Sequence, residues 1–431
     1  MLKDKKTILI FAYFFPPCGM TAAHRPLSWV KYFPKFGFYP IVITRNWDVE
    51  IKSQLDLSKP SGQDLRVDKF DTHEVHYIPF KGNVRDRLYV KYGDNKFRIL
   101  RKILSLLILF IDRLYFSMSE FSAFYKYAKE LTKKVKLDYV LVTAQPYLMH
   151  RLGYKLKKDF PNIKWVADYR DAWTTSEINL VNKGKLFTLL GKIDKRLERK
   201  WLSNASFVTS VSYPLAERIS KTFDLPGHEI QNGFELDEFA ELGDIGKFEK
   251  FTITYVGTLY PGQNIELFID AMKRLIDEGK TNIELSLPGL SFDIEQAERV
   301  RQAMKGFEKY VSITERIPKK DTLIIEKKSH ILLYVGWEGF TGVIGSKVYE
   351  YLASGTKLLV APGDNSCIDE IIEHSKAGVF RSSVDEVYDY LKRQYADFEK
   401  GNTQVNSMSD EIMTYSRQNQ ARLLAELLTS T

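Results

Sequence analysis

A strand followed by a glycine-bearing loop and a helix occurs at two places in this chain, and this repeated pattern most restricts its fold. The first copy runs from the apolar strand Thr7–Phe11 through a loop with Gly19 to a helix-like pattern over Thr21–Phe38. The second runs from Phe251–Leu259 through a Pro-Gly loop to the helix Ile265–Asp277. Each copy is typical of the opening of a doubly wound α/β sheet. The sequence therefore predicts two such sheets, one in each half.

Length and charge agree with two domains. The chain has 431 residues, of which 44% are apolar and 27% charged, enough for two globular domains of ordinary composition. Residues 1–240 hold 40 Lys and Arg against 26 Asp and Glu, whereas residues 241–431 hold 23 against 29. A polar run over Leu236–Lys250 separates two sheet-like blocks, so we place the boundary there, with domains at 1–240 and 241–410.

The two cysteines, Cys18 and Cys367, lie far apart and in no metal-binding pattern. This usage favours a reducing compartment and argues against structural zinc. The chain starts with lysines and a short strand rather than with the long apolar segment of a secretory signal. We therefore expect a cytoplasmic protein.

A basic stretch leads into the apolar run Ile103–Ile111, which is too short to span a bilayer. Two interpretations remain open. The run could dock peripherally at the inner face of the cytoplasmic membrane, with Arg98, Arg101, Lys102 and Arg113 meeting anionic head groups. It could equally be a buried core helix, since it is apolar nearly all round. The basic first half also suits a lipid diphosphate, but no nucleic acid is expected because no nucleic-acid-binding signature accompanies the charge.

Polar residues follow the predicted strands of the first half. Leu137–Thr143 and Lys164–Asp168 are apolar strands, and their carboxyl ends should face a ligand crevice. The residues predicted to gather there are His150, Asp168, Arg170 and Asp171, joined by Gly19 and Arg25 from the first loop and helix. His150 and Asp171 are candidate proton acceptors and Arg170 a candidate anion contact. The alternative is that Arg170 pairs with either aspartate and only fixes the strand to the next helix.

The stretch from Gly345 to Gly355 predicts a loop, a short amphipathic helix and a glycine stop before the strand Thr356–Val360. Gly345 and Ser346 leave the helix start open, so its unpaired N–H groups can face an anion, and Lys347 adds a full charge. Glu350, one turn on, offers an acceptor for sugar hydroxyls. Together these features predict a nucleotide-sugar site. The alternative is an ordinary helix with a solvated glutamate.

The run Glu-Tyr-Leu-Ala-Ser-Gly at 350–355 resembles the donor-site helix of glycosyltransferase family 4 and its relatives of the GT-B fold. The run Ala-Asp-Tyr-Arg-Asp-Ala-Trp at 167–173 is similar to a segment of a bacterial branch of these enzymes. The resemblance implies two Rossmann-like domains facing an interdomain cleft, and a C-terminal helix, 411–431, that crosses back to the first domain. It also implies sugar transfer from a nucleotide-diphosphate sugar, with retention, to a lipid-linked or glycan acceptor in cell-surface polysaccharide biosynthesis.

The chain departs from the family pattern in two ways. The places that match the family's donor arginine and lysine look like Thr258 and Gln263, and the first of its two glutamates is replaced by Gly342, with Glu338 nearby. We expect donor binding by Gly257, Thr258, Glu338, Gly345, Ser346, Lys347 and Glu350. No cofactor or metal is expected, since the chain has no Asp-x-Asp pair. A sugar-nucleotide epimerase of the same fold and a catalytically weakened binding protein remain alternatives.

Overall fold

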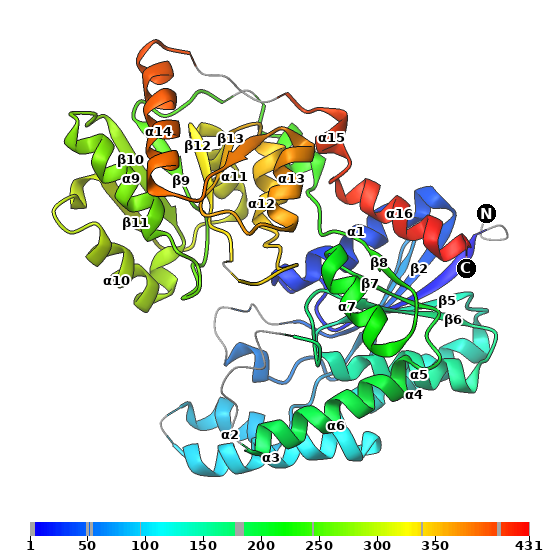
Figure 1. Cartoon of the computed structure of the whole chain (residues 1–431). Helices are drawn as coiled ribbons and strands as arrows, with labels where there is room; N and C mark the ends of the chain where they lie inside the picture. Colours follow the sequence, from blue (N-terminus) through cyan, green and yellow to red (C-terminus); the bar gives the residue numbers. More distant parts are fainter. Residues whose placement is uncertain are drawn as a thin grey trace. The chain divides into compact units, whose positions relative to one another are not determined.

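The computed structural model describes residues 5–48, 51, 55–94, 96–176, 185–243, 245–337, 339–402 and 407–430. Contacts divide the chain into two compact units (Figure 1). Unit 1 comprises Met1–Ile230 and Ala421–Thr431, and unit 2 comprises Gln231–Gln420. The first long segment of unit 1 thus ends before residue 240, the predicted boundary.

The sheet of unit 1 has the strand order β3-β4-β2-β1-β5-β6-β7-β8. All neighbours pair in parallel except β3 and β4, which are antiparallel. Its strands are β1 (Lys6–Ala12), β2 (Phe38–Arg45), β3 (Arg66–Lys69), β4 (Glu74–Ile78), β5 (Tyr139–Ala144), β6 (Lys164–Tyr169), β7 (Phe207–Ser210) and β8 (Gly227–Glu229). The central strands are buried nearly throughout, as apolar runs in parallel sheets require.

Helices connect these strands and cover the sheet. They are α1 (His24–Tyr32), α2 (Val84–Tyr92), α3 (Arg98–Leu114), α4 (Phe121–Lys134), α5 (His150–Asp159), α6 (Lys185–Leu202) and α7 (Tyr213–Phe223). The last helix of the chain is α16 (Arg417–Ser430). Its buried apolar residues Ala421, Leu424 and Leu428 pack in the same core cluster as Ile8 and Trp29, so the end of the chain completes unit 1.

The sheet of unit 2 is fully parallel, with the order β11-β10-β9-β12-β13-β14. Its strands are β9 (Phe251–Thr254), β10 (Ile283–Pro288), β11 (Val311–Thr314), β12 (Ile331–Tyr334), β13 (Lys357–Val360) and β14 (Gly378–Phe380). Its helices are α8 (Leu236–Ala240), α9 (Glu266–Asp277), α10 (Ile294–Ala303), α11 (Lys319–Lys328), α12 (Lys347–Ser354), α13 (Cys367–Ser375), α14 (Val384–Glu399) and α15 (Asp410–Met413).

In both sheets the first strand lies beside the fourth parallel strand in chain order: β1 beside β5 in unit 1, and β9 beside β12 in unit 2. The direction in which successive strands are added to the sheet reverses at that point. In unit 2 the order corresponds to 3-2-1-4-5-6, the arrangement of dinucleotide-binding sheets. In unit 1 the reversal lies between β1 and β5. Ligands of doubly wound sheets bind outside the carboxyl ends of the strands at this reversal. The loops after β1 and β9 are therefore the places to look for sites.

Most predicted elements are present, including α12 with its stop at Gly355, which adopts the left-handed conformation at φ 73°. Two segments differ from the expectation. The polar stretch 45–74 contains the edge strand β3, which the sequence analysis missed. The apolar run near 103–111 forms α3, whose only buried residue is Arg101, so the interpretation as a core helix is wrong. Within the described part of the chain, no helix combines the length and apolar character needed to cross a bilayer.

Candidate functional site

Two glycine loops meet at the strand ends of unit 2, and we call the pair the Gly257–Gly289 floor. Gly257 follows β9 with φ 85° and Gly289 follows β10 with φ 88°, a backbone region that strongly favours glycine. A Cβ atom added at Gly289 would lie 3.6 Å from the Gly257 Cα atom, so the two loops are in direct contact. The Gly257 N–H donates to the Pro288 carbonyl at 3.0 Å, which fixes this contact. Gly257, which follows β9, lies next to the strand reversal between β9 and β12, where doubly wound sheets bind their ligands.

Lys347, the first residue of α12, reaches this floor. Its Nζ lies 3.5 Å from the Thr258 carbonyl oxygen and 4.0 Å from the centre of the Tyr255 ring. A Cβ atom at Gly257 would lie 3.8 Å from Nζ. Burial lowers the pKa of Lys347 to about 7, while Glu326 and Glu350 act to raise it. A bound anion would favour the charged form, so the group is suited to a diphosphate.

Glu350 lies on the same helix and is held by a second lysine. Lys319 of α11 forms an ion pair with the Glu350 carboxylate and lies 3.3 Å from an oxygen of Glu238. The Glu350 side chain is 20% exposed, so it is neither buried nor a freely solvated acid. Lys319 therefore orients a carboxylate that remains accessible, as a hydrogen-bond acceptor for hydroxyl groups must be.

Behind these residues lies a buried acid, Glu326 of α11. It is 0% exposed, and among the described residues neither of its carboxylate oxygens has a hydrogen-bond partner. Burial raises the pKa of Glu326 well above its ordinary value, and Glu350 adds to this, whereas Lys319 and Lys347 lower it. The protonated form is therefore favoured at neutral pH.

The two residues at the places of the family's missing cations have structural roles. Gln263 is 4% exposed: its amide oxygen accepts from Tyr255 and from the Tyr260 N–H, and its Nε2 donates to the Val335 carbonyl at 2.6 Å. Thr258 contributes its carbonyl oxygen, which accepts from the Tyr255 hydroxyl at 2.8 Å. Both residues fix the glycine loop instead of supplying charge.

A cation that the sequence analysis missed lies beside the floor. Arg316 follows β11, is exposed, and its Cγ would be 3.8 Å from a Cβ atom at Gly289. Its guanidinium stacks on the Phe292 ring at 3.6 Å. The rule that polar residues at strand ends are site candidates, applied to the strand Val311–Ile313, would have identified it. Glu338, predicted as a donor contact, lies outside the described residues.

The start of α12 is less open than predicted, because one of its N–H groups already has a partner within the protein. Ser346 is the residue before the helix and makes no side-chain cap, and the Gly345 N–H donates to the Tyr334 hydroxyl at 3.0 Å. The start of α12 is thus fixed to β12 through Tyr334. Gly257, Thr258 and Lys347 come together at one place, with Glu350 one turn along the helix.

In unit 1, Asp168 and Arg25 form a buried ion pair. Arg25 is 3% exposed and Asp168 0%, and their closest atoms, Nη2 and Oδ1, are 2.7 Å apart. The hydroxyls of Thr143 and Thr209 donate to the same carboxylate at 2.8 and 2.7 Å. The pair joins α1 to strands β5, β6 and β7 and leaves no surface for a substrate. Direct contact of Asp168 or Arg25 with an acceptor, as predicted, does not fit this burial.

His150 lies in the core rather than at the surface. It is 1% exposed, its ring centre is 4.5 Å from that of Tyr169, and burial lowers its pKa to about 4. A role for His150 as proton acceptor does not fit this environment. Arg170 donates to the Ala144 carbonyl at 2.8 Å, which fixes β6 to the end of β5.

Asp171 and Gly19 are the predicted unit 1 residues that reach the surface. Asp171 is exposed and accepts from the Gln145 amide at 3.2 Å. Gly19 is exposed, and a Cβ atom there would meet no atom within 4 Å, so the fold does not require glycine at this position. Asp171 is therefore the predicted proton acceptor that a substrate could reach.

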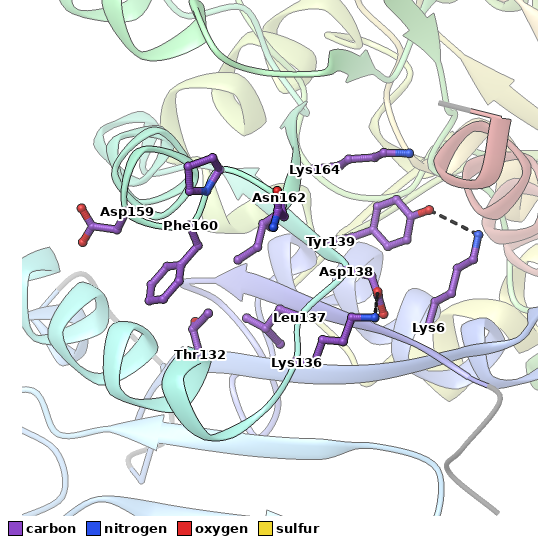
Figure 2. A pocket seen from close by; sticks show the side chains of 12 residues that line it. Lys6, Thr132, Lys136, Leu137, Asp138, Tyr139, Asp159, Phe160, Asn162 and Lys164 are labelled. Atoms are coloured by element: carbon purple, nitrogen blue, oxygen red, sulfur yellow. Dashed lines mark hydrogen bonds and ion pairs between the residues drawn. The ribbon is translucent and has the colours of Figure 1, made fainter.

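A pocket of about 460 Å³ lies elsewhere in unit 1 (Figure 2). It is lined by residues at the amino ends of β1, β5 and β6, among them Lys6, Asp138, Tyr139 and Lys164. Lys6 donates to the Tyr139 hydroxyl at 3.4 Å, and Asp138 accepts from the Thr7 N–H at 2.8 Å. Because it lies at the sheet edge opposite the strand carboxyl ends, it is separate from the candidate site.

Comparison with solved structures identifies the fold. The chain is similar to sucrose-phosphate synthase from Thermosynechococcus elongatus, with 14% identity, 99% of each chain covered and a TM-score of 0.63. A glycosyltransferase from Rickettsia africae matches with 13% identity, coverage of 99% of this chain and 98% of that one, and a TM-score of 0.60. HepE from Anabaena, in complex with UDP, matches with 12% identity, coverage of 99% and 100%, and a TM-score of 0.55.

These likenesses show that the chain has the GT-B fold of two Rossmann-like domains, as the sequence predicted. No protein-family model matches the chain, and no curated protein matches it in sequence.

Proposed function

We propose that the protein is a glycosyltransferase that moves a sugar from a nucleotide-diphosphate sugar to a lipid-linked or glycan acceptor in cell-surface polysaccharide biosynthesis. The observation that carries this proposal is the contact between the Gly257–Gly289 floor and Lys347, with Glu350 one turn further along α12. The fold supports it, since the similar structures include a glycosyltransferase and a complex with UDP.

The chemical problem in such a transfer is the charge that develops on the leaving diphosphate. The bond between the anomeric carbon and the diphosphate oxygen breaks, and the acceptor oxygen forms the new bond. Lys347 is placed to stabilise the departing oxygen, the missing side chain at Gly257 leaves room for the diphosphate beside it, and the exposed Arg316 adds a second cation. Glu350 would accept hydrogen bonds from ribose hydroxyls, oriented by Lys319.

On the acceptor side, Asp171 is the predicted group with an exposed carboxylate. It would take the proton of the acceptor hydroxyl as the new bond forms. Metal independence and retention of configuration are part of the proposal. The first rests on the use of Lys347 and Arg316 as cations, and the second on the family resemblance alone.

A thermal-shift screen over nucleotide-diphosphate sugars tests donor binding, because a ligand that binds only the folded protein raises its melting temperature. We expect one class of nucleotide sugar to raise it, and Lys347→Met to abolish the shift. Lys305→Met is the matched control, since Lys305 is an exposed lysine of the same unit. The absence of a shift with any nucleotide sugar would contradict the proposal.

Activity is then measured with the binding donor and extracted lipid-linked acceptors, in the presence of chelator. Sugar transfer that persists in chelator is the expected result, and its complete loss would contradict metal independence. Conversion of the donor without any acceptor would instead indicate a sugar-nucleotide epimerase. Donor binding without either reaction would indicate a binding protein. Product stereochemistry, read from anomeric coupling constants, tests retention.

A further inference from the structure

The helix α3 has its apolar residues on the outside. Eleven of its seventeen residues are Ile, Leu or Phe, yet the one residue of α3 that is buried is Arg101. We define the α3 face as Ile99, Leu100, Ile103, Leu107 and Leu114, whose exposed fractions range from 44% to 77%. Ile99, Ile103 and Leu107 are spaced by four residues and so lie along one side of the helix. A continuous exposed apolar stripe of this kind marks an interaction surface.

Two arginines of α3 that do not belong to the α3 face anchor the helix to the protein. Arg101 donates to the Asp94 carbonyl at 2.7 Å and stacks on the Tyr89 ring of α2 at 4.8 Å. Arg113 forms a two-bonded pair with Asp194 of α6, at 2.5 and 2.8 Å. These contacts hold α2, α3 and α6 together (Figure 1). The outward orientation of the α3 face is therefore fixed by specific contacts and is not an accident of a loosely packed helix.

Cations border the α3 face. Arg98 and Lys102 are exposed residues of α3. Lys102 follows Ile99 by three positions and so lies beside the apolar stripe, and Arg98 lies one turn before Lys102. Lys91 at the end of α2 is also exposed. At the start of the neighbouring α6, Phe187 and Leu189 add exposed apolar side chains. Apolar side chains flanked by lysine and arginine match the acyl boundary and head groups of an anionic lipid surface.

We propose that the α3 face docks unit 1 on an anionic membrane surface, with its apolar side chains in the acyl boundary and Arg98 and Lys102 on the head groups. Charge favours lipid over a second copy of the chain. A two-fold contact through this face would bring identical cations toward each other, at a cost in repulsion. The inference is independent of the proposed transferase activity, because lipid binding is measured without donor or acceptor.

Vesicle flotation of the full-length protein tests the proposal. The vesicles consist of phosphatidylcholine alone or of phosphatidylcholine with phosphatidylglycerol. We expect the protein to float with the anionic vesicles, less with the neutral ones, and less as salt is raised. Ile103→Glu combined with Leu107→Glu should abolish flotation. Ile294→Glu is the matched control, because Ile294 is 80% exposed but belongs to α10 of unit 2.

Charge reversal separates the head-group contribution. Arg98→Glu with Lys102→Glu should reduce binding to anionic vesicles by roughly tenfold or more, given the usual contribution of basic residues near such surfaces. Lys305→Glu with Lys309→Glu, two exposed lysines of unit 2, should leave it unchanged. Circular dichroism and melting curves confirm that each variant folds.

Three results would overturn the proposal. The first is wild-type protein that does not float with anionic vesicles. The second is flotation of the Ile103→Glu, Leu107→Glu variant at the wild-type level. The third is a dimer in sedimentation velocity that this variant dissociates while wild type shows no lipid binding, which would assign the α3 face to a second copy.

Discussion

Replacing Asp168 by Asn should destabilise unit 1 strongly, because it leaves a buried arginine without its charge partner. Arg25 is 3% exposed and makes three contacts of 2.7 to 3.2 Å with this carboxylate. Removing one partner of a buried ion pair costs about 3–5 kcal/mol. The change is expected in the free energy of unfolding, whatever ligand the protein binds. Thr143 and Thr209 donate to different oxygens of the carboxylate, so the asparagine amide keeps an acceptor for only one of them, and the lost hydrogen bond adds to the electrostatic cost.

Tryptophan fluorescence during urea unfolding measures this loss in unit 1. Five of the six tryptophans belong to unit 1, and the sixth is Trp337, so a Trp337→Phe background makes the signal specific. Glu130→Gln is the control: its ion pair with Lys133, also in unit 1, is exposed, and such pairs contribute about 0–1 kcal/mol. A loss below about 1 kcal/mol for Asp168→Asn would refute the reasoning and return Asp168 to the candidates for substrate contact.

Further predictions concern the site and the buried histidine. Glu350→Gln should raise the donor dissociation constant about tenfold in calorimetry, as expected for a lost charge-assisted hydrogen bond, and an unchanged constant would remove Glu350 from the site. Gly257→Ala should weaken donor binding in calorimetry, because a φ of 85° is strained for alanine and the loop beside Lys347 would shift, whereas Gly19→Ala should leave stability unchanged in melting curves. Burial lowers the pKa of His150 to about 4 in the folded protein, against 6.5 in the unfolded chain. Above pH 6.5 the ring is neutral in both states, and the free energy of unfolding falls by up to about 3 kcal/mol as the pH drops from 6.5 to 4. His150→Phe should flatten this decline in urea titrations, and an unchanged slope would contradict it.

The sequence allowed the two sheets and the α12 segment to be predicted because these depend on local patterns. Apolar strands, glycine loops and the stop at Gly355 are encoded within short windows. It could not distinguish a polar residue that faces a ligand from one that faces another strand. Asp168 and Asp171 are three residues apart, yet the first is completely buried and the second exposed. That difference depends on Arg25, which is 143 positions away from Asp168 in the chain.

The same limit explains α3. Its composition fits a core helix and a surface-docking helix equally well, because periodicity states which residues share a side but not what that side faces. The contacts of Arg101 and Arg113 with their neighbours decide the matter, since they hold these two side chains against the protein and leave the α3 face exposed. An arginine inside an apolar run therefore shows which side of a helix faces the protein only when its hydrogen-bond acceptor is known.

The residues that replace the expected cations of the family motif have structural roles in the folded protein. Gln263 occupies the place of an expected cation but is committed to three hydrogen bonds that shape the glycine loop. The positive charge at the floor comes instead from α12, through Lys347, and from the end of β11, through Arg316. A diphosphate needs positive charge at a given place, and the fold can supply it from different strands. The loss of a motif residue is therefore weak evidence for loss of activity here.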